Sequence, residues 1–394
     1  MEPVFLTEAR PEVQALRSSK IRDVANAGMG REDVLPFWFG EPDETTPDYV
    51  RAAAIAALEA RQTFYTQTLG LPRLREGIAH YLTGLHRPTG VDSIAVTSSG
   101  TAALMLAIQA LVNPGDRVVA VTPLWPNLVE MPKVLGAQVV TVPLAFASTG
   151  WQLDLQCLLD ALTPGTKALL LNAPNNPTGW TLSRETQQAI LDHCRQRGIW
   201  IVSDDVYERI YYEGSCAPSF LDIAHEQDRV ISCNSFSKAW LMTGWRLGWM
   251  VVPRPLLAQV SKLIEYSTTC APPFIQSAGL VALEQGEATI ARTVARLRQG
   301  RDHLRAGLQT VPGVALAAPS PGAMYTFFRI DGLVDSLAFC KRLVSEGGLG
   351  LAPGVAFGPE GEGYLRWCYA SSTERLDDGV QRLARYLDAN PLAH

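Results

Sequence analysis

Between about residue 90 and residue 250, short apolar runs rich in β-branched residues alternate with longer amphipathic stretches. This alternation is typical of β-α units, in which strands buried on both faces form a parallel sheet covered by helices. Two of the amphipathic stretches, 101–112 and 183–198, carry apolar residues at helical spacing and are predicted to be helices. The predicted strands are 93–97, 117–121, 137–142, 167–172, 199–203, 229–233 and 247–252.

The two ends of the chain have a different character. An Arg-rich amphipathic stretch at 288–308 is followed by strand-like pieces at 324–330 and 364–369, with a helix-like segment between them. We therefore expect an α/β fold in which a large domain, a mostly parallel sheet sandwiched by helices, carries a smaller α+β domain built from both chain ends. The expected boundaries are 46–289 for the large domain, and 1–45 with an N-terminal arm plus 290–394 for the small one.

Composition narrows the class of protein. The chain has 394 residues, of which 47% are hydrophobic, and its net charge of −5 gives no basic surface for nucleic acid. No apolar run approaches the ~18 residues that a membrane-spanning helix needs. The N-terminus lacks the basic and apolar segments of a signal peptide. The sequence thus predicts a cytoplasmic protein with no nucleic-acid or membrane partner.

Cysteine and histidine usage argues against disulfides and metal sites. The seven cysteines are scattered along the chain, so reduced and mostly buried thiols are the simplest interpretation. The six histidines form no H-x-x-x-H motif and no cluster with cysteine along the sequence. We therefore expect no metal site.

Polar residues follow several of the predicted strands, at the carboxyl ends where open α/β sheets bind ligands. The first strand is followed by a segment that leads into a helix, Ser99, Gly100 and Thr101. This segment is either an anion-binding site or an ordinary helix N-cap. Asn176 lies in a turn rich in Asn, Pro and Gly after the fourth strand. It either shapes that turn or aims its amide into a site.

Charged residues follow the next two strands. Asp204 comes directly after apolar strand residues, where burial is costly without a positive partner, so we expect a buried ion pair. For Asp205 a surface loop is the simpler interpretation, and Tyr207 follows closely. Lys238 stands among apolar neighbours, which lower a lysine pKa and favour the neutral amine of imine chemistry, although a lone lysine usually faces solvent.

Together these groups make one pyridoxal phosphate site. It consists of a phosphate-binding segment, an amide, an acid near a phenol, and an amine followed eight residues later by Arg246. With these residues in this order, the sequence resembles the fold-type I pyridoxal-phosphate enzymes, class I/II aminotransferases. The resemblance runs over nearly the whole chain. Its motifs are FWFGEPDETTP (37–47), FYTQTLGLPRLREGIA (64–79), APNNPTG (173–179), VSDDVYE (202–208), SFSKAWLMTGWRLGW (235–249) and YLRWCYA (364–370).

The resemblance implies the residues that act on the cofactor ring. Lys238 matches the lysine that binds the cofactor aldehyde as an internal aldimine and, once substrate displaces it, shuttles the proton at the substrate α-carbon. Asp204 matches the acid that keeps the pyridine nitrogen protonated. Tyr207 and Asn176 match groups that hydrogen-bond the phenolic oxygen. Trp125 matches the aromatic that stacks on the ring, although a core tryptophan is the simpler interpretation of the residue alone.

The resemblance also implies a phosphate site, in which an arginine gives a fixed fork of donors to the dianion. Tyr65 matches a tyrosine that reaches the phosphate of the neighbouring subunit, which implies a homodimer with shared sites. The remaining implied phosphate residues are Ser99, Gly100, Thr101, Ser235 and Arg246.

For the substrate, Arg366 matches the arginine that grips the α-carboxylate, and Gly40 matches a backbone contact to the same group. Trp125 and Asn176 also border the substrate in this family. On residue type alone, Arg366 is equally well a structural ion pair. Asp205 stands where the family more often has glutamate, and we expect little effect because Asp204 is the cofactor acid. No second arginine can be placed for a distal carboxylate, so a preference for aspartate or glutamate is not implied.

The resulting prediction is a transaminase that moves an amino group from an amino acid to a 2-oxo acid. One alternative is a β-eliminating lyase on the same scaffold, because the same cofactor chemistry can expel a β-substituent. A second alternative is a cofactor-sensing regulator with a fused DNA-binding domain. That class needs a helix-turn-helix before the FGEPD region, where only about forty residues without a basic pattern precede it.

Overall fold

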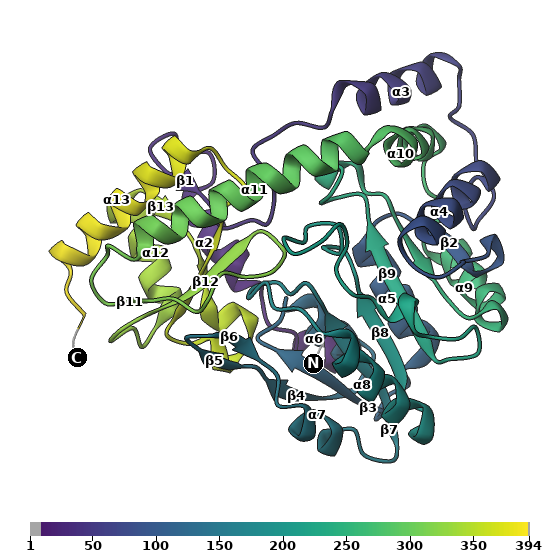
Figure 1. Ribbon diagram of the computed structural model, residues 1–394, viewed down its shortest axis with the longest axis horizontal. Coiled ribbons are helices and arrows are strands. Elements are labelled where there is room, and N and C mark those ends of the chain that lie inside the picture. The colour runs from purple at the N-terminus through teal and green to yellow at the C-terminus, as the bar shows by residue number, and fades with distance from the viewer. Residues whose placement is uncertain (1–8, 393–394) are drawn as a thin grey trace, which may run out of the picture.

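The computed structural model describes residues 9–392, and its central feature is a sheet of seven strands (Figure 1). The strand order is β2-β10-β9-β8-β7-β3-β4, and only β10 runs antiparallel to its neighbours. All seven predicted strands are confirmed, each within two residues of the predicted ends. They are β2 (Ile94–Thr97), β3 (Arg117–Thr122), β4 (Gln138–Pro143), β7 (Thr166–Asn172), β8 (Trp200–Asp204), β9 (Val230–Ser235) and β10 (Gly248–Val251).

Helices cover both faces of this sheet (Figure 1). The helices of this part of the chain are α3 (Asp48–Glu59), which packs on α10, and α4 (Pro72–Leu85), α5 (Gly100–Leu111), α6 (Asn127–Val134), α7 (Leu155–Ala161), α8 (Arg184–Arg197), α9 (Arg254–Ser267) and α10 (Pro273–Gln285). In β3, Val118 and Ala120 pack in a core with α5 and α9, whereas Val119 and Val121 pack in another with α7 and α8. Burial on both faces explains why the strands read as continuous apolar runs. Helices α5 and α8 confirm the two helices predicted between the strands.

A second, smaller sheet is built from the C-terminal part of the chain. Its order is β11 (Val314–Ala315), β12 (Tyr325–Ile330), β15 (Tyr364–Cys368) and β14 (Ala352–Pro353). The predicted strand-like pieces are β12 and β15, and the predicted helix between them is α12 (Ser336–Gly347). Helix α13 (Thr373–Ala389) packs on α12.

Both chain ends contribute to the core around the small sheet. Helix α2 (Lys20–Gly28) buries Ile21 and Val24 in the same apolar cluster as Phe328 and Leu365. Beside it, β1 (Leu35–Pro36) pairs in parallel with β13 (Leu349–Gly350). The α/β fold, with an α+β part built from both chain ends, is therefore the predicted one.

The predicted domain boundaries remain a proposal. The one at 289/290 falls in the first turn of α11 (Glu287–Leu308), the helix that the Arg-rich amphipathic stretch forms. Figure 1 shows α11 running from the end of α10 to the small sheet, so one continuous helix links the two parts. Residues 1–8, which make up most of the N-terminal arm, lie outside the described residues. The described part of the arm includes α1 (Pro11–Gln14). Beside it, Arg10 donates a hydrogen bond to the Val134 carbonyl at the end of α6.

The remaining elements are short. They are the hairpin β5 (Ala145–Ala147) and β6 (Gly150–Gln152) and the 3₁₀ helices η1 (Val91–Ser93), η2 (Phe220–Asp222), η3 (Thr243–Trp245), η4 (Gly354–Phe357) and η5 (Pro359–Gly361). Over residues 9–392, no helix has both the length and the apolar character to cross a membrane. All seven cysteines are free thiols, four of them buried.

Candidate active site

A cavity of about 420 Å³ lies at the carboxyl ends of the central strands, where the sequence predicted the site. Eleven of the thirteen predicted site residues line it. Helix α5 begins there after β2, and the loops after β3, β7, β8 and β9 supply further walls. The predicted residues that line it are Gly40, Gly100, Thr101, Trp125, Asn176, Asp204, Tyr207, Ser235, Lys238, Arg246 and Arg366.

Lys238 reaches the cavity from the turn that follows β9 and is half-buried. Its Nζ donates a hydrogen bond to the Gly40 carbonyl and lies 5.8 Å from the centre of the Tyr207 ring. Burial, aided by the positive charges of Arg366 and Arg246, lowers the pKa of Lys238 from 10.5 to about 8. A sizeable fraction of the amine is therefore neutral near physiological pH, as nucleophilic chemistry requires.

Asp204 ends β8 and is buried, with 4% of its surface exposed. Its carboxylate accepts one long hydrogen bond from the Val206 N–H, at 3.3 Å. Burial, followed by the negative charge of Asp205, raises the pKa of Asp204 to about 7, although Lys238 opposes this. No ion pair joins Asp204 to any side chain within residues 9–392. The burial predicted from the sequence is confirmed, but the predicted ion pair with a cationic group is not found among the described residues.

Asp205 is not in a surface loop, so that interpretation was wrong. It is 2% exposed and accepts hydrogen bonds from the Ser203 and Ser232 hydroxyls. The reason is that β8 and β9 are neighbours in the sheet, so the residue after β8 is still covered by β9. Burial, with the nearby charge of Glu208, raises the pKa of Asp205 to about 6.

Arg366 lies on β15 and is 2% exposed. Its guanidinium stacks between the rings of Tyr325 and Phe357, with centroids at 4.5 and 5.0 Å. It donates to the Asn176 side-chain oxygen at 3.0 Å and to the Trp38 carbonyl, while its buried Nε has no partner among residues 9–392. Because no carboxylate pairs with it in the described part of the chain, the structural ion-pair alternative is wrong.

The phosphate end of the predicted site is formed by α5, β9 and Arg246. Ser99 caps α5, accepting the Ala102 N–H at 3.0 Å, so its side chain lies beside the cavity and not in its lining. Its backbone has φ 151° and ψ 165°, a region that is costly for any residue but glycine, and such strain concentrates at functional sites. Ser235 donates to Ser237 at 2.8 Å. Among residues 9–392, the Arg246 side chain bonds only the Thr243 carbonyl, at 2.7 Å.

Tyr65 is the predicted residue that lies away from the cavity. It is 87% exposed, and the adjacent Phe64 is 79% exposed. A surface tyrosine contributes nothing to the site of its own chain. The role implied for it requires a second chain.

Sequence reasoning missed several residues that line the cavity. Tyr325 on β12 shares a hydrogen bond of 2.5 Å with the Tyr207 hydroxyl, and a Cβ on Gly40 would lie 1.8 Å from its oxygen. Arg22 lines the cavity from α2, with its guanidinium 5.5 Å from the centre of the Phe39 ring. No local signal marks these residues, because only the fold brings β12 and α2 to the strand ends.

The donors around the cavity fit the pyridoxal phosphate that the resemblance implied. Asp204 is a buried acid that lacks a cation, as a protonated ring nitrogen would supply. Lys238 is an amine whose pKa is lowered to about 8. Arg246 forms no ion pair with a described carboxylate and lies beside the start of α5, where helix geometry favours an anion. These groups border one cavity.

Comparisons with known proteins agree with this geometry. The family model "Aminotransferase class I and II" matches residues 32–383. The chain is similar to an aspartate aminotransferase of Pyrococcus horikoshii (33% identity; 95% of this chain, 96% of that protein) and to a probable N-acetyl-LL-diaminopimelate aminotransferase of Bacillus subtilis (31%; 96% and 95%). The structure of Thermus thermophilus aspartate aminotransferase with maleate superposes with a TM-score of 0.88 (32%; 96% and 99%).

Relatives with these names do not favour the β-eliminating alternative. Both the sequence match and the superposition extend over nearly the whole chain, including the strand ends that carry the cavity. The chain belongs to the class I and II aminotransferases, the pyridoxal-phosphate-dependent enzymes that move an amino group between an amino acid and a 2-oxo acid.

Proposed function

We propose that the cavity holds pyridoxal phosphate through Lys238 and catalyses transamination in two half-reactions, first with an amino acid donor and then with a 2-oxo acid acceptor. The observation that carries this proposal is the placement of Lys238, Asp204, Arg246 and Arg366 around one cavity. When bound, the cofactor supplies an electron sink that stabilises negative charge on the substrate α-carbon.

Lys238 and Asp204 are the proposed proton-handling groups. With a pKa of about 8, the Lys238 Nζ can take up and release a proton near neutral pH, which suits a base that acts at the substrate α-carbon. Asp204 provides the negative charge that holds a proton on the ring nitrogen. Burial raises the pKa of Tyr207 well above its usual value, so its hydroxyl stays protonated and donates to the cofactor's phenolic oxygen.

Asn176 is proposed to be the second donor to that phenolic oxygen. Its side-chain oxygen accepts from Arg366, which leaves the Asn176 amide nitrogen as the donating end. Trp125, half-buried at the start of α6, is proposed to stack on the ring. The same contact between Asn176 and Arg366 links the cofactor site to the substrate site.

The proposed phosphate site uses both backbone and side-chain donors. Its residues are Ser99, Gly100, Thr101, Ser235 and Arg246. The start of α5 offers unsatisfied N–H groups and a positive helix end. Arg246 adds a charged guanidinium that forms no ion pair with a described carboxylate.

Arg366 is proposed to bind the α-carboxylate, because its guanidinium is fixed by two aromatic rings, its bonded partners are neutral oxygens, and its Nε has no partner among the described residues. Gly40 is proposed to contact the same carboxylate through its backbone. Arg22 is the one charged residue lining the described cavity that these assignments leave over. We propose that it favours acidic side chains, in keeping with relatives named aspartate aminotransferases.

A homodimer is proposed from the aromatic surface around Tyr65. Phe64, Tyr65 and Tyr266 are 79%, 87% and 91% exposed, and a second copy of the chain would cover them. Tyr65 would then reach the phosphate of its partner. The free state of all seven cysteines supports residence in a reducing compartment such as the cytoplasm.

Cofactor titration and a panel of amino acids test this function. Pyridoxal phosphate added to the cofactor-free protein should produce the near-visible absorbance of a lysine-bound cofactor. A substrate amino acid, added without 2-oxo acid, should remove that absorbance and yield pyridoxamine phosphate and the matching 2-oxo acid. Pyruvate and ammonia as products from serine or cysteine would contradict transamination and indicate elimination.

A further inference from the structure

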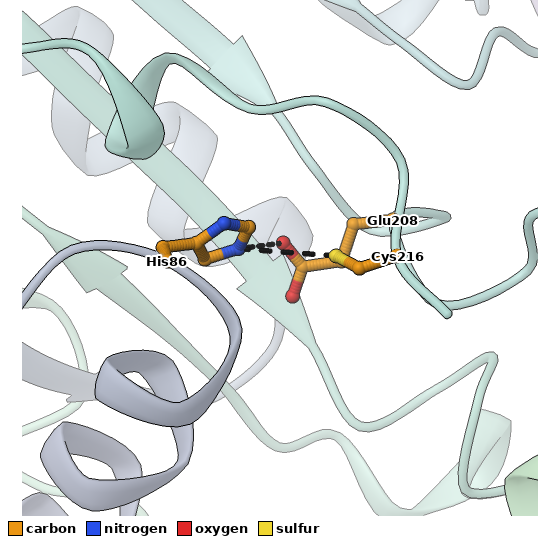
Figure 2. Close-up of side chains that lie close together, drawn as sticks. All are labelled: His86, Glu208 and Cys216. Carbon is orange, nitrogen blue, oxygen red and sulfur yellow. Dashed lines mark hydrogen bonds and ion pairs between the residues drawn. The ribbon is translucent and has the colours of Figure 1, made fainter. Parts of the chain in front are cut away.

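A buried ionic cluster lies behind the cavity and has no part in the proposed function. Figure 2 shows His86, which follows α4, facing Glu208 and Cys216 from the segment after β8. The His86 and Glu208 side chains are only 1% and 3% exposed. His86 Nε2 lies 3.2 Å from a Glu208 oxygen, and His86 Nδ1 lies 2.9 Å from an oxygen of Asp222.

The imidazole of His86 is positively charged. Both of its nitrogens face carboxylates, which only accept hydrogen bonds, so both nitrogens must carry a proton. Burial disfavours this charge, but the hydrogen bonds to Asp222, Cys216 and Glu208 outweigh it and raise the pKa of His86 to about 12. A doubly protonated ring has no lone pair for a metal ion, so the cluster is an ion network.

The ionic cluster fixes the orientation of one amide. The second oxygen of Glu208 lies 2.7 Å from Asn234 Nδ2 on β9. Because a carboxylate only accepts, the NH₂ end of Asn234 must point to Glu208. The Asn234 oxygen then points the other way and accepts the Ser235 N–H at 2.7 Å.

Ser235 has little room to move. A Cβ added to Gly100 would lie 2.9 Å from the Ser235 Cβ and 3.3 Å from the Asn234 carbonyl oxygen, so the start of α5 already touches this corner. The Ser235 hydroxyl donates to Ser237, and both serines line the cavity. A displacement at Asn234 is therefore passed on to the phosphate end of the site.

We propose that His86 and Glu208 are positioning residues that set the cofactor phosphate site, because they lock the Asn234 amide in the one orientation that holds the Ser235 backbone. This inference rests on the proposed function, in which Ser235 and the start of α5 bind the phosphate. His86 holds one oxygen of the Glu208 carboxylate, and the other oxygen dictates which end of Asn234 faces Ser235.

The donor and acceptor pattern gives a sharp test. In Glu208→Gln, the glutamine oxygen faces the charged His86, so its NH₂ group meets the Asn234 NH₂ group. Rotation of the Asn234 amide relieves that conflict but places its NH₂ against the Ser235 N–H. In the double variant Glu208→Gln/Asn234→Asp, the glutamine donates to the aspartate, the aspartate accepts the Ser235 N–H, and every hydrogen bond and the net charge are retained.

The experiment measures cofactor dissociation constants and the ³¹P resonance of the bound phosphate for the purified full chain. Glu208→Gln is expected to weaken pyridoxal phosphate binding by about tenfold, the effect of one unsatisfied buried donor, and to shift the resonance. The double variant is expected to return both values close to wild type. Asp228→Asn, which breaks the ion pair of Asp228 with Arg195 far from Asn234, is the matched control and should change neither.

The outcomes separate this inference from the proposed function. Wild-type protein that binds no pyridoxal phosphate contradicts both. A Glu208→Gln protein that binds the cofactor like wild type, or a double variant that folds without regaining affinity, contradicts the inference alone. If the single variant does not fold, the double variant decides, because it must fold and bind like wild type. Stoichiometric zinc in the purified protein would also overturn the inference, because His86 would then be a metal ligand.

Discussion

At the scale of single residues, the site depends on groups whose protonation is set by burial. Lys238 and Asp204 sit in the same cavity, and burial shifts both toward their neutral forms. In the cofactor-free protein, burial of these two groups lowers the free energy of unfolding until a ligand binds. The stability of that form should therefore depend on pH in a way that identifies each group.

Asp204 is expected to make the cofactor-free protein less stable as pH rises. Its folded pKa of about 7 exceeds the ordinary value of 3.8, so the folded state binds more protons between these values. The stabilising contribution of Asp204 to folding is fully present below about pH 4 and is lost as pH rises through about 7. The unfolding free energy of Asp204→Asn minus that of wild type should therefore increase by up to about 4 kcal/mol between pH 4 and pH 8. Urea unfolding at a series of pH values measures this, and a constant difference between the two proteins would contradict it.

Gly40 is a position where no side chain fits. A Cβ there would lie 1.8 Å from the Tyr325 hydroxyl oxygen, which is itself bonded to Tyr207. Gly40→Ala should destabilise the protein by about 1–3 kcal/mol through overpacking and weaken cofactor binding. Removing the hydroxyl in Gly40→Ala/Tyr325→Phe should restore part of the loss.

The control for this steric effect is Gly84→Ala in α4, where a Cβ meets nothing within 4 Å. It should be neutral or stabilise by up to about 1 kcal/mol, as alanine does in helices. Thermal unfolding compares the variants. Equal stability of the Gly40→Ala and Gly84→Ala proteins would show that the contact with Tyr325 is not limiting.

At the scale of elements, the site is a meeting of strand ends with one helix from the far end of the sequence. Helix α2 is held against the small sheet by Ile21 and Val24, and this packing carries Arg22 to the cavity. Arg22 is the arginine that we propose for a distal carboxylate. Only the packing of α2 shows that it borders the site.

Substituting Arg22 should change substrate preference. Arg22→Gln removes the positive charge from the cavity wall, so the kcat/KM for aspartate should fall about tenfold relative to that for phenylalanine, about what one charge-assisted hydrogen bond contributes. Lys20→Gln makes the same change of charge on α2 outside the cavity lining and serves as the control. Equal losses for both amino acids would contradict a role in recognising the side chain.

At the scale of the whole molecule, much of the architecture could be predicted from local pattern. Strands such as β2, β3 and β7 are buried on both faces, so their apolar runs are displayed directly by the sequence, whereas the edge strand β4 is partly exposed. Contacts between distant segments could not be predicted. Asp205 is covered by a neighbouring strand, and Tyr325 and Arg22 reach the cavity through the packing of the small part. Such positions follow from tertiary structure and leave no periodic signal.

The exposed aromatic surface should form a dimer interface. Sedimentation should give twice the chain mass of 42.9 kDa. Phe64→Glu places a charge on that surface and should shift the equilibrium to monomer, because burying an unpaired charge is costly. Val334→Glu, at a residue that is 85% exposed in the small part, is the control and should leave the mass unchanged. A monomeric wild type would contradict the shared site.

Lys238 is proposed to hold the cofactor, and locating the bond between them tests this directly. The protein loaded with pyridoxal phosphate is reduced with borohydride, which makes the link to a lysine permanent, then digested and analysed by peptide mass spectrometry. We expect one phosphopyridoxyl group per chain on the peptide that contains Lys238, and none in Lys238→Ala. A modified lysine elsewhere, or equal labelling of the variant, would contradict it.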